Sequence, residues 1–218
     1  MSTLGTTMPT DPQAARSGMR RADYLLFGVL ALGLIAIAGT TFAMWPVGPK
    51  PPPLSVVGGP FRLQSSKGGV LDSASLRGKP FLVFFGFTQC PNVCPTTLAD
   101  LSNLIDEMQK QGGDIQALYI TLDPERDTAA VLSEYMKSFS DRITGLTGTP
   151  AEIDRVAASY RAYAKRVPLP DGDYTLEHTL MVYLMDQNGG FIGPLDLGAG
   201  HGLALKQIRQ ALKGHQNS

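Results

Sequence analysis

The chain has 218 residues, of which 43% are hydrophobic, and its 19 basic and 19 acidic side chains give a formal net charge of zero. Nucleic-acid-binding proteins usually carry a basic excess, so this balance argues against nucleic acid as a partner. The length fits one or two domains. The hydrophobic residues are spread unevenly, because many of them lie near the N-terminus.

Residues 24–45 form an apolar stretch that contains no charged side chain. About 20 apolar residues in a helix cross a bilayer, so the stretch is long enough for a transmembrane anchor. Arg16, Arg20 and Arg21 precede it, and the positive-inside rule therefore places residues 1–23 in the cytoplasm. We expect a retained anchor rather than a cleaved signal peptide, whose apolar core would be shorter and would end at small residues.

The Pro-rich residues 46–54 follow the expected anchor and are typical of a semi-rigid spacer. Residues 55–218 then have the length of one domain. In a bacterium this domain would lie on the periplasmic side of the inner membrane, and in a mitochondrion it would face the intermembrane space. Because free thiols tend to oxidise in the periplasm, we expect the two cysteines of this domain to form a disulfide, to cycle between redox states or to bind a metal.

Strand and helix signals alternate along the domain. A hairpin is expected within residues 56–79, and the continuous apolar run 81–87 predicts a strand that is buried on both faces. Apolar residues at helical spacing between Leu98 and Met108 predict a helix that ends at Gly112. The remaining predicted elements are a strand at 115–122, a helix at 128–139, a short strand at 143–146, a helix at 150–163, a polar loop at 166–177, a strand at 179–185, a partner strand at 191–197 and a helix at 202–213. This order predicts an α/β fold with thioredoxin-like topology.

Both cysteines of the chain, Cys90 and Cys94, lie between the strand at 81–87 and the helix that follows it. Pro91 and Pro95 suit a first helical turn, where a missing N–H costs no hydrogen bond. If the intervening residues are helical, the spacing puts both sulfurs on one face near a helix N-terminus, which lowers a cysteine pKa. We favour metal binding over disulfide exchange, a structural disulfide or a pair of buried inert thiols, but the spacing alone leaves these open.

Three histidines, His178, His201 and His215, are available as further ligands. His215 belongs to the polar tail, and His201 lies in a glycine-rich segment where an exposed loop or cap position is expected. His178 ends the polar loop and directly precedes an apolar strand, and the loops at this side of an α/β sheet are where functional sites collect. We therefore expect His178 to join the two cysteines.

Two thiolates and one imidazole suit Cu(I) better than structural zinc. Zinc generally takes four ligands and would need Glu177 or Asp123 as well. Met181 and Met185 are interpreted as core residues of an apolar strand rather than as copper ligands. In the segment at 121–128, Asp or Thr residues are expected to cap the next helix and Arg126 is expected to pair with a neighbour, without a role in chemistry.

Three segments in this order resemble the SCO/SenC family: GKPFLVFFGFTQCPNVCPTTLADL at 78–101, TLDPERDT at 121–128 and YTLEHTLMVYLMDQNG at 174–189. The resemblance implies a thioredoxin-like domain on a membrane tether. It implies a copper chaperone that serves the dinuclear copper-A centre of cytochrome c oxidase subunit II, and it allows for an upstream copper donor.

The resemblance also implies that Cys90, Cys94 and His178 bind copper. Two positions depart from the family pattern, because Asn92 stands where an acidic residue is frequent and Glu177 stands where aspartate is usual. Neither departure removes a ligand.

Two other functions compete with the copper chaperone. The same dithiol suits a thiol–disulfide reductase, which would reduce the cysteines of the acceptor site and for which His178 would be dispensable. The string VCPTT around Cys94 is similar to peroxiredoxins, but Pro91 occupies the position where those enzymes usually have Thr or Ser.

Overall fold

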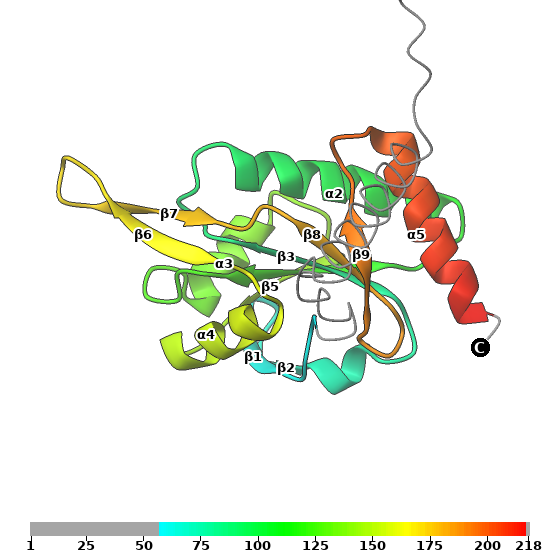
Figure 1. Cartoon of the computed structure of the whole chain (residues 1–218), viewed down its shortest axis with the longest axis horizontal. Coiled ribbons are helices and arrows are strands. Elements are labelled where there is room, and N and C mark those ends of the chain that lie inside the picture. Colours follow the sequence, from blue (N-terminus) through cyan, green and yellow to red (C-terminus); the bar gives the residue numbers. More distant parts are fainter. Residues whose placement is uncertain (1–56, 217–218) are drawn as a thin grey trace, which may run out of the picture. The chain divides into compact units, whose positions relative to one another are not determined.

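The computed structural model describes residues 57–216 (Figure 1). The expected cytoplasmic segment, anchor and spacer, residues 1–54, lie outside this part of the chain. Within the described residues, no helix combines the length and the apolar character that crossing a membrane requires.

Seven strands form one mixed sheet in the order β2-β1-β5-β4-β3-β8-β9. The strands are β1 (Arg62–Ser65), β2 (Val70–Asp72), β3 (Phe81–Gly86), β4 (Gln116–Thr121), β5 (Ile143–Thr147), β8 (Val182–Met185) and β9 (Phe191–Leu195). The three central strands β3, β4 and β5 are parallel, and an antiparallel hairpin lies on each side of them. Every residue of β3 is buried, which explains why its sequence is a continuous apolar run.

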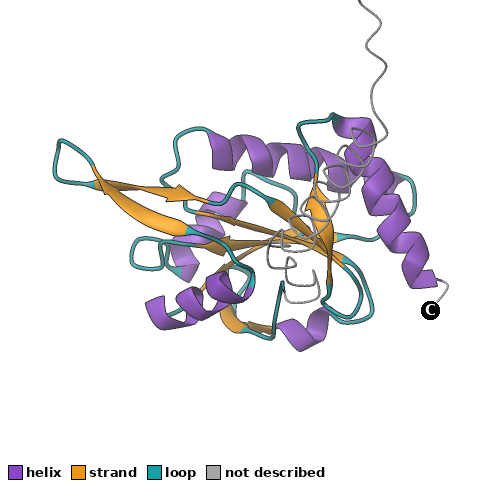
Figure 2. Ribbon diagram, in the orientation of Figure 1, coloured by secondary structure: helices purple, strands orange, loops and turns teal. Residues whose placement is uncertain are grey.

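Helices cover both faces of the sheet (Figure 2). They are α2 (Val93–Lys110), α3 (Ala129–Met136), α4 (Pro150–Ser159), α5 (His201–Gln216) and the short 3₁₀ helix η2 (Ser73–Leu76). The first core cluster joins α2, α3 and α5 to one face, and the second joins α4 and η2 to the other. Side chains alternate along β3 accordingly, since Phe84 belongs to the first cluster and Phe85 to the second.

The predicted thioredoxin-like α/β order is confirmed, although several elements are shorter than expected. The helix predicted at 128–139 ends at Met136, and the one predicted at 150–163 ends at Ser159. Arg161 has a φ of 55°, in the left-handed region, which is incompatible with continuing α4. The chain then enters a strand.

The prediction of a polar loop at 166–177 is wrong, because this segment forms a second, two-stranded sheet of β6 (Ala164–Pro168) and β7 (Tyr174–His178). This hairpin projects beyond the main sheet (Figure 1). Prolines and charges obscured it in the sequence, yet Asp171-Gly172 is a turn signal, and Gly172 has a φ of 89°. The strand pattern was also present, since Leu176 is buried between exposed and half-buried neighbours.

Candidate metal centre

The two cysteines occupy the turn and the first helical residues that follow β3. Cys90 precedes α2, and its N–H donates to the carbonyl of Phe87 at 3.2 Å. Cys94 is the second residue of α2, and its N–H donates to the sulfur of Cys90 at 3.4 Å. Asn92, at the N-cap position, makes no side-chain capping bond. The sulfur of Cys90 therefore accepts from a helix N-terminus, where a negative charge is stabilised.

His178 is the last residue of β7, and its ring faces the buried cysteine. Nε2 of His178 lies 3.6 Å from the sulfur of Cys94, while Nδ1 lies 2.9 Å from the carbonyl oxygen of Thr179. A carbonyl only accepts, so Nδ1 carries the proton and the lone pair of Nε2 points toward the cysteines. Burial lowers the pKa of His178, against the opposing effect of the Thr179 carbonyl, and favours the neutral ring that metals bind.

The structure brings the three predicted ligands together. One ligand atom from each of Cys90, Cys94 and His178 can be chosen so that all lie within 4.8 Å of one another. Among residues 57–216 this is the one group of three or more His, Cys, Asp or Glu side chains that converges in this way. Both cysteines are free thiols rather than a structural disulfide. Two sulfurs and an imidazole nitrogen form a soft donor set that fits Cu(I).

The prediction that the helix start lowers the cysteine pKa is wrong for Cys94. Its side chain is completely buried, and desolvation raises the pKa of its thiol to about 12, although the backbone of Phe87 acts in the opposite direction. The loss of water around the sulfur outweighs the contacts with Phe87 and Tyr119 that lower the pKa. Cys94 is therefore a thiol at neutral pH and becomes a thiolate readily only beside a cation.

Gly86, the last residue of β3, makes room for the sulfur of Cys94. A Cβ atom at position 86 would lie 2.8 Å from that sulfur and 2.8 Å from the ring of Tyr119. The role of this residue was not predicted from the sequence. Its signal was a lone glycine inside the large apolar residues of FLVFFGF, a pattern that marks a close approach to the backbone.

Asp127 fixes the turn that leads to Cys90, and this contact was not predicted from the sequence either. Its buried carboxylate accepts from the backbone N–H and the hydroxyl of Thr88, at 2.9 and 2.5 Å, and from the hydroxyl of Thr121 at 2.6 Å. Two expectations for the same segment are confirmed, because Thr128 caps α3 and Arg126 forms an ion pair with a neighbour. The spacing along the chain gave no sign that Asp127 reaches back to Thr88.

The other candidate ligands lie outside the cluster. His201 is exposed at the start of α5, as expected, and its Nε2 lies 2.6 Å from a carboxylate oxygen of Glu107. Glu177 is exposed, and neither it nor Asp123 joins the converging group that a zinc site would require. Met185 is fully buried in the core, which confirms its structural role. Nothing is described of the side chain of His215.

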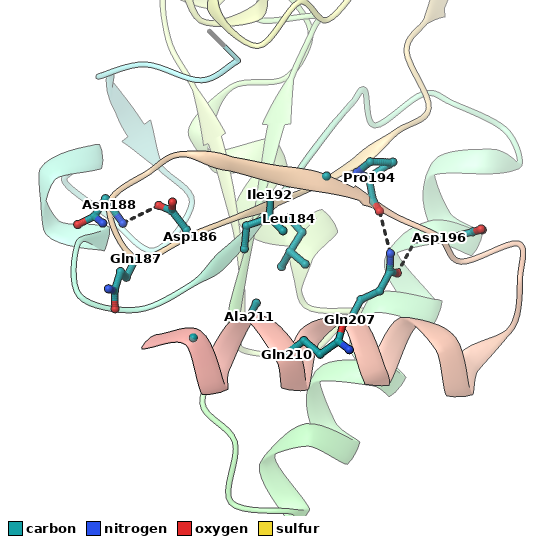
Figure 3. Close-up of a pocket in the computed structure, with 12 residues that line it drawn as sticks. Leu184, Asp186, Gln187, Asn188, Ile192, Pro194, Asp196, Gln207, Gln210 and Ala211 are labelled. Carbon is teal, nitrogen blue, oxygen red and sulfur yellow. Dashed lines mark hydrogen bonds between the residues drawn. The ribbon is translucent and has the colours of Figure 1, made fainter. Parts of the chain in front are cut away.

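A cavity of about 610 Å³ lies elsewhere, between β8, β9 and α5 (Figure 3). Two of its polar side chains, Gln207 and Asp186, hold neighbouring backbone groups in place. The Gln207 amide donates to the carbonyl of Pro194 and accepts from the N–H of Asp196, so it covers the outer edge of β9. The carboxylate of Asp186 accepts from the N–H groups of Asn188 and Gly190 in the turn. None of the three predicted ligands lines this cavity.

Curated relatives cover the domain that contains the cluster. The "SCO2-like protein" of Rickettsia felis is 37% identical over 161 residues, which are 73% of this chain and 77% of that protein. "Protein SCO1 homolog 1, mitochondrial" of Arabidopsis thaliana is 40% identical over 139 residues, which are 63% of this chain and 42% of that protein. The chain thus spans less than half of the Arabidopsis protein.

Solved structures share the fold. ScoI of Bradyrhizobium japonicum with copper bound has a TM-score of 0.68 and 46% identity, over 72% of this chain and 99% of that one. Yeast Sco1 with copper bound has a TM-score of 0.67 and 36% identity, over 72% and 88% of the two chains. BsSco, described as a member of the Sco family of cytochrome c oxidase assembly proteins, has a TM-score of 0.61 and 25% identity, over 74% and 96%.

The family comparison agrees with these likenesses. The SCO1/SenC family pattern matches residues 49–213, which is most of the chain and includes both cysteines and the histidine of the cluster. The chain belongs to the SCO1/SenC family.

Proposed function

We propose that this protein is a copper metallochaperone, which binds Cu(I) through Cys90, Cys94 and His178 and delivers it to the dinuclear copper-A site of cytochrome c oxidase subunit II. The observation that carries the proposal is the lone pair of His178 Nε2, directed at the buried sulfur of Cys94 from 3.6 Å. Copper in the related ScoI and Sco1 structures supports the choice of metal. The description of BsSco as belonging to a family of oxidase assembly proteins supports the choice of partner.

The two cysteines have different roles in this proposal. Cys94 is buried and its pKa is raised, so it gives up its proton when Cu(I) compensates the charge of the sulfur. Cys90 is half-buried, and its sulfur accepts from the N–H of Cys94 at 3.4 Å. An incoming ligand from the acceptor protein reaches the ion most easily from the side of Cys90, and Cys94 is then the last sulfur to be released.

We further propose that residues 24–45 hold the protein in the inner membrane and that an upstream protein donates the copper. The apolar stretch and the preceding arginines support the first proposal, with residues 1–23 in the cytoplasm. A thiol- or thioether-rich donor would match the soft ligands of the cluster.

A second candidate function is reduction of the oxidised cysteines of the acceptor site. The two free thiols, one half-buried and one buried, are the observation that favours it. The thiolate of Cys90 would attack the acceptor disulfide and release one acceptor thiolate. Cys94 would then transfer its proton to the acceptor thiolate just released, attack the sulfur of Cys90 and release the second acceptor thiolate. The cysteine pair thereby loses two electrons and the acceptor disulfide gains them.

Cu(I) titration of the full-length protein in detergent, against a chelator of known affinity, tests the proposal. We expect one copper per chain in the wild type, and loss of affinity in Cys90→Ser, Cys94→Ser and His178→Ala. Thiol–disulfide exchange, measured in parallel, should survive in His178→Ala, which separates the two functions. Wild-type copper affinity in His178→Ala would remove His178 from the site and contradict the three-ligand proposal.

A further inference from the structure

The guanidinium of Arg126 connects three segments that meet at the metal centre. Its Nε donates to the carboxylate of Asp123, just after β4. Its Nη1 donates to the side chain of Gln89 at 2.7 Å, to the carboxylate of Asp173 at 3.1 Å and to the carbonyl of Tyr174 at 3.0 Å. Gln89 directly precedes Cys90, whereas Asp173 and Tyr174 lie at the start of β7. One largely buried side chain, 17% exposed, therefore bridges the cysteine turn and the histidine hairpin.

Tyr174 completes this connection from the side of the hairpin. The guanidinium of Arg126 lies 3.8 Å from the centre of the Tyr174 ring, a distance typical of cation–π stacking. The hydroxyl of Tyr174 donates to Asp123 at 2.8 Å. Asp123 is 1% exposed, so its carboxylate is a fixed anchor for both partners. We call Asp123, Arg126 and Tyr174 the hairpin clamp.

The clamp acts on the strand face that carries the proposed copper ligand. In β7, Tyr174, Leu176 and His178 point to the same side, because alternate residues of a strand share a face. Leu176 is buried between the other two. Beyond His178, the N–H of Thr179 donates to the carbonyl of Tyr163 at 3.0 Å, which ties down the base of the hairpin. The clamp and this base contact thus hold the strand on either side of His178.

We propose that Arg126 and Tyr174 are positioning residues, which lock the β6–β7 hairpin onto the cysteine turn and thereby hold His178 beside Cys94. Neither residue is one of the three proposed ligands, so their effect on copper is transmitted through the strand. As far as it concerns copper, this inference rests on the proposed function. The holding of the hairpin itself does not require the metal.

Tyr174→Leu is the most informative variant. It removes the stacked ring and the hydroxyl but keeps the buried ion pair between Arg126 and Asp123. Substituting Arg126 instead would leave a buried carboxylate without its cation and would destabilise the whole domain. Arg166→Gln is the matched control, because the guanidinium of Arg166 lies over the same ring at 4.6 Å, pairs with exposed Glu125 and does not contact the cysteine turn.

The first readout is the rate at which full-length protein releases Cu(I) to an excess of chelator. Tyr174→Leu should release copper about tenfold faster than the wild type, equal to about 1.4 kcal/mol, and Arg166→Gln should change the rate less than about twofold. Tyr174→Phe keeps the ring and should fall between them. In a His178→Ala background, Tyr174→Leu should not change the rate of copper release further, because a residue that acts only through His178 has no effect once that side chain is removed.

The second readout is amide hydrogen exchange of the copper-free protein. The amides of residues 175–178 should exchange about tenfold faster in Tyr174→Leu, while those of β3 keep their wild-type rates. Unchanged exchange in β7 would overturn the proposal, as would a Tyr174→Leu effect on copper release that persists at full size in His178→Ala. If the wild type holds no copper, the proposed function fails, and the exchange rates still decide whether the clamp holds the hairpin.

Discussion

The cysteine side and the histidine side of the cluster are held in place by different physics. Cys94, the second residue of α2, belongs to the apolar core cluster that α2 forms with β3 and the neighbouring strands. His178 comes from a projecting two-stranded hairpin, which polar contacts and one stacked ring connect to the cysteine turn. Apolar packing fixes the sulfur as part of the fold. The position of the nitrogen depends on a few polar and stacking contacts, so the substitution of Tyr174 can alter it without unfolding the domain.

The largest effect on the free energy of unfolding is expected at Gly86, beside the sulfur of Cys94. Gly86→Val should lower the free energy of unfolding by about 3 kcal/mol, because its side chain would overlap the sulfur of Cys94 and the ring of Tyr119. Urea denaturation measures this change. Gly193→Val in β9 is the matched control, since a Cβ at position 193 has no neighbour within 4 Å. Equal losses in the two variants would contradict the close approach at Gly86.

The turn before Cys90 should show the next largest effect. Asp127→Ala removes the acceptor of three hydrogen bonds and leaves two half-buried donors of Thr88 and the buried hydroxyl of Thr121 without it. We expect a loss of about 2 kcal/mol in the free energy of unfolding, measured by urea denaturation. The exposed Asp154→Ala is the control and should differ little from the wild type. A neutral Asp127→Ala would contradict a supporting role for this carboxylate.

The two cysteines should also differ in reactivity. In the copper-free protein, Cys90 should react with iodoacetamide at pH 8 at least about tenfold faster than Cys94, because thiolate is the reactive form. Cys94 is fully buried and its pKa is about 12, so its thiolate fraction rises only as the pH approaches that value. Mass spectrometry of Cys90→Ser and Cys94→Ser variants gives the two rates separately. Equal rates would contradict the difference in burial.

The smallest effect is expected at the helix cap next to the clamp. Thr128→Ala removes the side chain that accepts from the N–H of Val131 and should cost about 1 kcal/mol of unfolding free energy. Copper affinity should remain at the wild-type value, because the cap does not contact the cysteine turn or the hairpin. Thr128→Ser keeps the hydroxyl and should restore most of the stability. A large loss of copper affinity in Thr128→Ala would show that the segment acts as one unit.

The contrast between apolar core packing and polar contacts of distant segments also explains which features could be predicted from the sequence. The buried central strands, the helix after the cysteines and the three convergent residues follow from apolar periodicity, spacing and family motifs. The β6–β7 hairpin was not predicted, because its prolines and charged residues are typical of a loop and its alternation of apolar and polar residues is short. The raised pKa of Cys94 was missed because helix position is local, whereas desolvation depends on chain segments distant in sequence. Arg126 was predicted to pair nearby, but its contacts to Gln89 and Tyr174 are long-range.

The ligand set can be identified from the X-ray absorption spectrum of the Cu(I)-loaded full-length protein. We expect two sulfur atoms and one nitrogen atom to coordinate the copper, and we expect the nitrogen to be lost from the spectrum in His178→Ala. A wild-type spectrum without nitrogen, or one that His178→Ala leaves unchanged, would contradict the assignment of Cys90, Cys94 and His178 as the copper ligands.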